Sequence, residues 1–199
     1  MHSKRVKNQE ELGWWIRHIS GDPGGWRESL LSEFADLPGY PALLHLGDRP
    51  CGRVLDVGCG PKSPARQLNH TEMWGVDPLI PWYAAIGFPV YDLGVVLLDC
   101  VAEDMWPIPR DWFDTIVSCN ALDHCDDFAA VASEIERVAK PDAMIRLWIA
   151  YHAPTPTEPL DLDDETIRQS FCRFEMKMVH SCTHNSIVTE KLWTNKPDE

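Results

Sequence analysis

The chain has 199 residues, and 18 lysines and arginines stand against 31 aspartates and glutamates, which gives a formal charge of −13. This length fits one ordinary domain with a real hydrophobic core, and the acidic balance disfavours a broad nucleic-acid-binding surface. No apolar run reaches the roughly 18 residues that a membrane span needs, and the start shows no secretory signal. The seven cysteines lack C-x-x-C spacing, which favours free thiols. We therefore expect a cytoplasmic protein whose partner is a small molecule or another protein, with no nucleic acid and no membrane.

The first part of the chain is predicted to be helical. In residues 10–47, apolar side chains recur at helical spacing before the glycine- and proline-rich segment 21–25, and a second helix is predicted over 26–37. The pattern then changes to short apolar runs. We therefore expect residues 1–50 to form a helical cap and residues 51–199 to form the main domain.

Short apolar runs alternate with helical stretches in the main domain. The predicted strands are residues 53–57, 73–76, 95–101, 113–119, 144–151, 173–180 and 187–193. A helix is predicted to begin at Ser63-Pro64, with Ser63 as its N-cap and Pro64 at the first helical position. Further helices are predicted over 126–140 and 164–171. Runs that are apolar throughout and separated by helices indicate a parallel sheet covered on both faces. The last two strands are joined by too short a connection for a parallel crossover, so we expect them to be antiparallel.

The segment Val54-Leu-Asp-Val-Gly-Cys-Gly60 gives the strongest functional signal. Two glycines directly after a buried strand allow a tight turn and a close approach to a ligand. Asp56 falls at the carboxyl end of this strand, where open α/β sheets bind ligands, and Asp77 falls at the end of the next strand, where an acidic side chain accepts hydrogen bonds from ribose. This pattern fits a nucleotide-type cofactor.

The charge beside the glycines selects among such cofactors. The third glycine of a dinucleotide fingerprint is missing, because Pro61, Lys62 and Ser63 follow Gly60. The carboxylate of Asp56 would repel a pyrophosphate but suits a ligand with an ammonium group. S-adenosylmethionine has an ammonium, a sulfonium and a ribose but no phosphate. The local charge therefore favours S-adenosylmethionine over the cofactor of a dinucleotide oxidoreductase.

The motifs LDVGCG, GVDP, AEDM and FDTIVSCNALDH resemble, in this order, those of class I S-adenosylmethionine-dependent methyltransferases of the type 11 branch. The resemblance covers about residues 50–150. It implies a Rossmann-like α/β fold with a seven-strand sheet, an antiparallel C-terminal hairpin and an N-terminal helical cap. The cofactor-binding positions that it implies are Asp56, Gly58, Cys59, Gly60, Asp77, Ala102, Glu103, Asn120 and Leu122.

Two departures from the family pattern keep other functions open. Val101 stands where a hydrogen-bonding side chain often precedes Ala-Glu, so Glu103 or Asp104 would have to recognise the adenine amino group, or packing alone would hold adenine. Lys62 places a cation near the glycine loop. Besides methyl transfer to a small molecule, we therefore consider a non-catalytic binding partner of another protein, and other chemistry on S-adenosylmethionine.

Two histidines are candidates for a catalytic base. His124 and His152 follow the fourth and fifth predicted strands, where the acceptor should lie, and Asp123 or Asp126 is expected to orient His124. The alternative is that His124 has a structural role in its loop. The resemblance also implies that the N-terminal segment, with Trp14, Trp15 and Trp26, covers the acceptor pocket.

We predict no metal site. His180, Cys182 and His184 alternate on one predicted strand as zinc ligands do. However, the same alternation continues from Phe174, Met176 and Met178, which indicates the core side of the strand. The acidic run 161–165 is explained by a helix N-terminus.

Overall fold

The computed structural model describes residues 2–20, 44–88, 90–92, 94–184 and 188–196. The predicted helix over 26–37, with Trp26, lies outside these residues. The helices are α1 (His2–Ser20), α4 (Ile80–Ala85), α5 (Phe128–Val138) and α6 (Asp164–Ser170). The strands are β1 (Pro50–Val57), β2 (Asn69–Val76), β3 (Val96–Leu98), β4 (Phe113–Cys119), β5 (Ala139–Tyr151), β6 (Lys177–His184) and β7 (Val188–Thr194). Within the described ranges, no helix has the length and hydropathy needed to cross a membrane.

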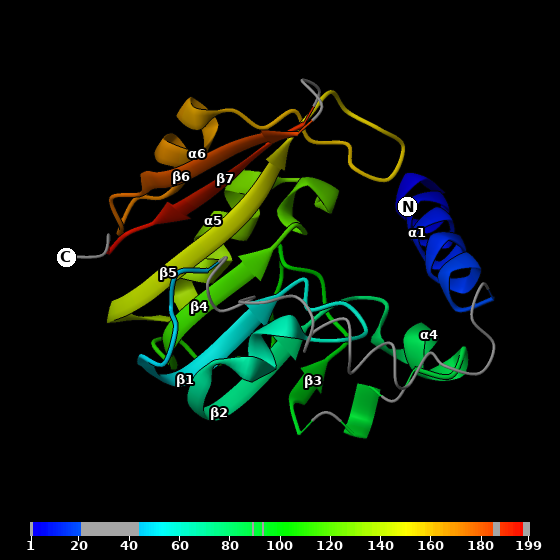
Figure 1. The fold of residues 1–199 in the computed structure, drawn as a ribbon, viewed down its shortest axis with the longest axis horizontal. Coiled ribbons are helices and arrows are strands. Elements are labelled where there is room, and N and C mark those ends of the chain that lie inside the picture. The colour runs from blue at the N-terminus through cyan, green and yellow to red at the C-terminus, as the bar shows by residue number, and fades with distance from the viewer. Residues whose placement is uncertain (1, 21–43, 89, 93, 185–187, 197–199) are drawn as a thin grey trace.

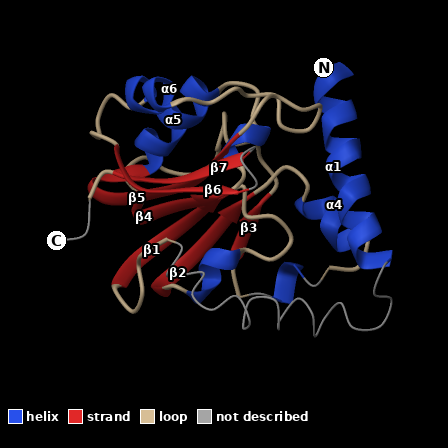
Figure 2. Cartoon of the chain, turned by 45° about the horizontal axis from the view of Figure 1, so that its top comes forward, coloured by secondary structure: helices blue, strands red, loops and turns tan. Residues whose placement is uncertain are grey.

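The strands form one seven-stranded sheet in the order β3-β2-β1-β4-β5-β7-β6 (Figure 1). The pairs among β1 to β5 are parallel, whereas β7 pairs antiparallel with both β5 and β6. The predicted Rossmann-like sheet with an antiparallel C-terminal hairpin is therefore confirmed. The helix α1 stands at the side toward which the parallel strands point, while α5 and α6 lie together on one face of the sheet (Figure 2).

The helix α5 shows why this face of the sheet is well packed. The side chain of Asp127 caps its N-terminus by accepting a hydrogen bond from the Ala130 N–H at 3.1 Å. Its apolar stripe is buried against the sheet. The buried apolar residues of the helix are Phe128, Val131, Ala132, Ile135 and Val138. The helix ends at Val138, two residues before the predicted end at Lys140, and the chain enters β5 directly.

The predicted helix at Ser63-Pro64 is only a 3-10 turn, Pro64–Gln67. Ser63 has a φ of 40° and makes no capping hydrogen bond; its hydroxyl instead donates to a carboxylate oxygen of Asp56 at 3.1 Å. The N-cap prediction is therefore wrong, because a buried carboxylate seven residues earlier competes for the same hydroxyl.

The prediction that one face of the sixth strand is its core side holds for only part of the segment. Phe174 and Met176 are buried, but they precede β6, which begins at Lys177. Met178 is 40% exposed, and the exposed ring of His180 stacks on Trp148 with 5.7 Å between ring centroids. A register shift between Met178 and His180 breaks the alternation.

The fully buried Ile135 makes the fold testable. Because Ile135 is 0% exposed in the main core, Ile135→Ala should lower the free energy of unfolding by about 2–5 kcal/mol. Chemical denaturation measures this change. The exposed Ser133 of the same helix provides the control, and Ser133→Ala should stay within about 0.5 kcal/mol of the wild type. Equal effects of both substitutions would contradict the described packing of α5.

Candidate active site

A pocket of about 410 Å³ opens at the carboxyl ends of β1, β2 and β4. Its volume lies in the range of small-molecule and cofactor sites. All nine residues that the sequence predicts for the cofactor line this one pocket: Asp56, Gly58, Cys59, Gly60, Asp77, Ala102, Glu103, Asn120 and Leu122. The predicted positions, far apart in the sequence, thus come together at the topological switch between β1 and its two neighbours, where ligands bind in such sheets.

The two glycines after β1 have different roles. Gly58 has a φ of +71°, and a Cβ built on it would lie 2.3 Å from the Cβ of Ala121. Gly60 has a φ of +57°, and its Cβ would meet no described atom within 4 Å. Gly58 therefore lets two loops approach each other, whereas Gly60 leaves open space for a ligand beside the backbone.

Asp77 clamps this glycine loop. One carboxylate oxygen accepts a hydrogen bond from the Gly60 N–H at 3.0 Å, and the other accepts one from the Leu79 N–H at 2.8 Å. Burial raises the pKa of Asp77 to about 6, although these two hydrogen bonds act in the opposite direction. Each oxygen keeps a second lone pair, so the predicted bonds to a ribose remain open to Asp77.

Asp56 adds a second buried acidic group to the same pocket. Its side chain is 1% exposed. Burial is the main cause that raises the pKa of Asp56 to about 7, and the charge of Asp77 raises it further, against the opposing hydrogen bonds from Ser63 and Ala65. A cationic ligand would stabilise both carboxylates in their charged form. The pocket therefore fits the ammonium and sulfonium groups of S-adenosylmethionine.

The predicted adenine side of the pocket is formed by the segment after β3. Ala102 is buried, and a carboxylate oxygen of Glu103 accepts a hydrogen bond from the Asp126 N–H at 2.8 Å. Glu103 thereby joins this segment to the residues just before α5. Across the pocket, Asn120 has a φ of 50°, a conformation that asparagine tolerates, and its N–H donates to the Trp148 carbonyl at 2.8 Å.

The helix α1 supplies one wall of the pocket. Glu11, Trp14 and Trp15 are among the lining residues. The ring of Trp15 makes edge contacts with Tyr83 and Phe88, at centroid distances of 5.9 and 5.7 Å, and its N–H donates to Glu11 at 3.0 Å. The N-terminal helical cap thus borders the cofactor site through α1. That it covers an acceptor stays a prediction.

His124 lies in the pocket wall between two other segments. Its Nδ1 is 3.4 Å from a Glu11 oxygen of α1, and its Nε2 is 3.8 Å from a Glu158 oxygen of the proline-rich loop that follows β5 (residues 152–159). Asp123, one of the two residues expected to orient His124, contacts His152 instead. Sequence reasoning missed Glu11 and Glu158, because neither carries a local signal of its role.

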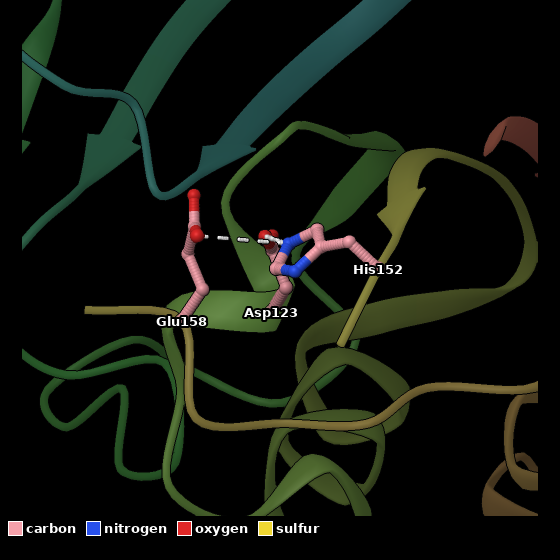
Figure 3. Close-up of side chains that lie close together, drawn as sticks. All are labelled: Asp123, His152 and Glu158. Atoms are coloured by element: carbon pink, nitrogen blue, oxygen red, sulfur yellow. Dashed lines mark hydrogen bonds and ion pairs between the residues drawn. The ribbon is translucent and has the colours of Figure 1, made fainter. Parts of the chain in front are cut away.

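His152 is not among the described residues that line the pocket. Its Nε2 lies 3.1 Å from Asp123 and 3.7 Å from Glu158 (Figure 3). Partial burial lowers the pKa of His152, but the hydrogen bonds to Ala153 and Asp123 and the charge of Glu158 outweigh it, so that the pKa is raised. His152 and His124 therefore both lie near Glu158, but only His124 is among the residues that line the cofactor pocket.

The chain is similar in sequence to known methyltransferases. A family model described as a methyltransferase domain matches residues 55–147. Sterol 24-C-methyltransferase ERG6B from Gibberella zeae is 30% identical over 113 residues, which cover 53% of this chain and 30% of that protein. The match thus spans about a third of the curated relative.

Two solved structures show the same fold. Phosphoethanolamine N-methyltransferase 2 from Haemonchus contortus, in complex with S-adenosyl-L-methionine, matches with a TM-score of 0.56 and 20% identity over 69% of this chain and 36% of that one. The 1,6-didemethyltoxoflavin-N1-methyltransferase from Burkholderia thailandensis, with 1,6-didemethyltoxoflavin and S-adenosylhomocysteine bound, matches with a TM-score of 0.54 and 18% identity over 86% and 87% of the two chains.

The raised pKa of Asp56 predicts a pH dependence of stability without cofactor. Since the pKa of Asp56 is about 7 in the folded chain and an ordinary aspartate has a pKa of 3.8, the folded chain binds more protons than the unfolded chain. This carboxyl therefore lowers the free energy of unfolding as pH rises from about 4 to about 7. The melting temperature of Asp56→Asn should therefore fall less than that of the wild type between about pH 5 and about pH 8. Thermal unfolding measures this difference.

The exposed Asp161 offers a control with the same change of charge. Asp161→Asn should keep the pH dependence of the wild type. An equally steep decline in Asp56→Asn would show that Asp56 ionises as an ordinary carboxyl.

Proposed function

We propose that this chain is a class I S-adenosylmethionine-dependent methyltransferase, with S-adenosylmethionine as its cofactor, and that it transfers a methyl group to a small-molecule acceptor. The match of residues 55–147 to a methyltransferase domain supports this proposal. One observation carries this proposal: the nine predicted cofactor residues and His124 all border a single acidic pocket. The names of the relatives, which act on a sterol, phosphoethanolamine and 1,6-didemethyltoxoflavin, support a small molecule as the acceptor.

The chain's residues would hold the cofactor by charge and by shape. Asp56 suits the ammonium group, Asp77 the ribose hydroxyls, and the open space at Gly60 allows close contact with the backbone. The segment with Ala102 and Glu103 would pack beside adenine. When bound, the cofactor supplies an electrophilic methyl group on a good leaving group.

The protein's part in methyl transfer is then to position the acceptor, to exclude water and, where the acceptor must lose a proton, to accept it. Trp14 and Trp15 of α1 offer an apolar wall that would exclude water from the pocket. His124, between Glu11 and Glu158, is the side chain we propose as proton acceptor. Its two acidic neighbours would orient the imidazole ring.

A non-catalytic, methyltransferase-like partner of another protein is the second candidate. It is favoured by Glu103, one of whose oxygens already accepts the Asp126 N–H, and by Val101, whose side chain cannot bind the adenine amino group. This candidate predicts weak cofactor binding and a stable complex with another chain. Other chemistry on the same cofactor would consume S-adenosylmethionine without a methylated product. For any of these functions we propose the cytoplasm, where the seven cysteines would remain free thiols.

The first test measures cofactor binding by calorimetry. Asp77→Ala removes the acceptor of the Gly60 and Leu79 N–H groups, so both S-adenosylmethionine and S-adenosylhomocysteine should bind at least about tenfold more weakly, as the loss of charge-assisted hydrogen bonds implies. The exposed Asp99, just after β3, serves as the control, and Asp99→Ala should bind both ligands like the wild type.

Failure of the wild type to bind either ligand at millimolar concentration would refute the cofactor site. Unchanged affinity in Asp77→Ala would refute the role of Asp77 alone. Tight binding without any transfer of a labelled methyl group to small-molecule fractions of a cell extract would favour the non-catalytic candidate.

The second test concerns His124. If His124 accepts a proton from the acceptor, His124→Ala should lower the rate of methyl transfer about 10²–10⁴-fold, while the dissociation constant of S-adenosylmethionine changes little. The rate of methyl transfer is measured as S-adenosylhomocysteine formation, with an acceptor identified by the transfer of labelled methyl groups to the extract fractions. Calorimetry measures the dissociation constant of S-adenosylmethionine. A variant with the wild-type rate would leave His124 with a structural role.

A further inference from the structure

Three side chains from separate segments, those of Asp123, His152 and Glu158, lie close together (Figure 3). Asp123 belongs to the 3-10 turn Leu122–His124 after β4, His152 follows β5 directly, and Glu158 lies in the proline-rich loop. One oxygen or nitrogen atom from each residue lies within 4.8 Å of those of the other two. Carboxylate oxygen and imidazole nitrogen are ligand atoms that divalent transition-metal ions accept.

The tautomer of His152 makes this cluster a candidate metal site. Its Nδ1 lies 2.8 Å from the Ala153 carbonyl oxygen. Because a carbonyl can only accept, Nδ1 carries a proton and donates it, as the second nitrogen of a metal-binding histidine usually does. Nε2 is then the nitrogen whose lone pair is free to bind a ligand. It lies 3.1 Å from an oxygen of Asp123 and 3.7 Å from an oxygen of Glu158. Such convergence of electron pairs requires a positive charge among them, either a proton or a cation.

The second oxygen of Asp123 is an independent sign of a missing ligand. Asp123 is 1% exposed, and its Oδ1 is buried without a hydrogen-bond partner among the described residues. An unsatisfied buried carboxylate oxygen is costly, and a cation held by both oxygens of Asp123 would remove this cost. Figure 3 shows this carboxylate beside the imidazole of His152.

The third side chain is held in place by its own loop. The hydroxyl of Thr155 donates a hydrogen bond to Glu158 Oε2 at 2.8 Å, and the Glu158 N–H donates to the same hydroxyl at 3.0 Å. Hydrogen bonds of this kind orient the carboxylate ligands of metal sites. Two donors bonded to one ion at about 2.1 Å lie about 3–3.4 Å apart, so the separations of 3.1 and 3.7 Å need only small shifts.

We propose that Asp123, His152 and Glu158 bind one divalent transition-metal ion, which ties the proline-rich loop to the turn after β4. The site adjoins the cofactor pocket through Glu158, whose other oxygen lies 3.8 Å from His124. It lies outside the methyltransferase proposal and does not depend on it, since the ion would bind whether or not methyl transfer takes place.

The test titrates Mn²⁺ into the full chain after treatment with a chelator, and follows the free ion by electron paramagnetic resonance. Mn²⁺ prefers oxygen and nitrogen over thiolate, so the seven cysteines interfere little. The wild type should bind one ion per chain at micromolar concentration. Glu158→Gln, on an exposed loop, and Asp123→Asn should each bind it at least about tenfold more weakly.

Asp161→Asn removes an exposed charge from the same part of the chain and should bind Mn²⁺ like the wild type. Circular dichroism of each variant confirms that the fold is kept, and Glu158→Gln carries the test if Asp123→Asn does not fold. The proposal is overturned if the wild type binds no ion at millimolar Mn²⁺, or if the substitutions at residues 123 and 158 leave binding unchanged.

Discussion

The double hydrogen bond of Asp77 is the interaction on which the pocket depends. Its carboxylate receives the Gly60 N–H from the loop after β1 and the Leu79 N–H from the residue preceding α4. Because Asp77 directly follows β2, one buried side chain connects three segments at the edge of the sheet. The same negative charge acts on Asp56 and makes the pocket acidic. Shape and charge of the cofactor site therefore have a common origin.

The hydrogen bonds of Asp77 also connect the pocket to the N-terminal helix α1, through α4. The residues that follow Leu79 form α4, whose Tyr83, together with Phe88, receives the ring of Trp15 from α1. These aromatic contacts belong to a separate small core beside the pocket. The wall contributed by α1 thus packs against α4, and the N-cap residue of α4, Leu79, donates its N–H to Asp77. A change in the glycine loop would therefore alter the support of α1 as well as the binding of the cofactor.

The sequence predicts well what depends on neighbours along the chain. A buried strand followed by Gly58 and Gly60, and an acidic residue after the next strand, place the pocket correctly because parallel strands bring their carboxyl ends together. The sequence fails where a partner outside the local segment decides the structure. The Ser63 hydroxyl, for example, donates to Asp56 and does not cap the predicted helix. The partnership of His152 with Asp123 and Glu158 was equally hidden, because only the folded sheet brings together the turn after β4 and the loop after β5.

His124 joins the two parts of the molecule that lie outside the sheet core. Its ring stands between Glu11 of α1 and Glu158 of the proline-rich loop, and it also borders the cofactor pocket. In the function we propose, the acceptor would meet the cofactor where these three parts adjoin. The sheet and the glycine loop then hold the cofactor, while the two outer segments select the acceptor. In that proposal, one imidazole close to both segments connects acceptor selection to the position of α1 beside the pocket.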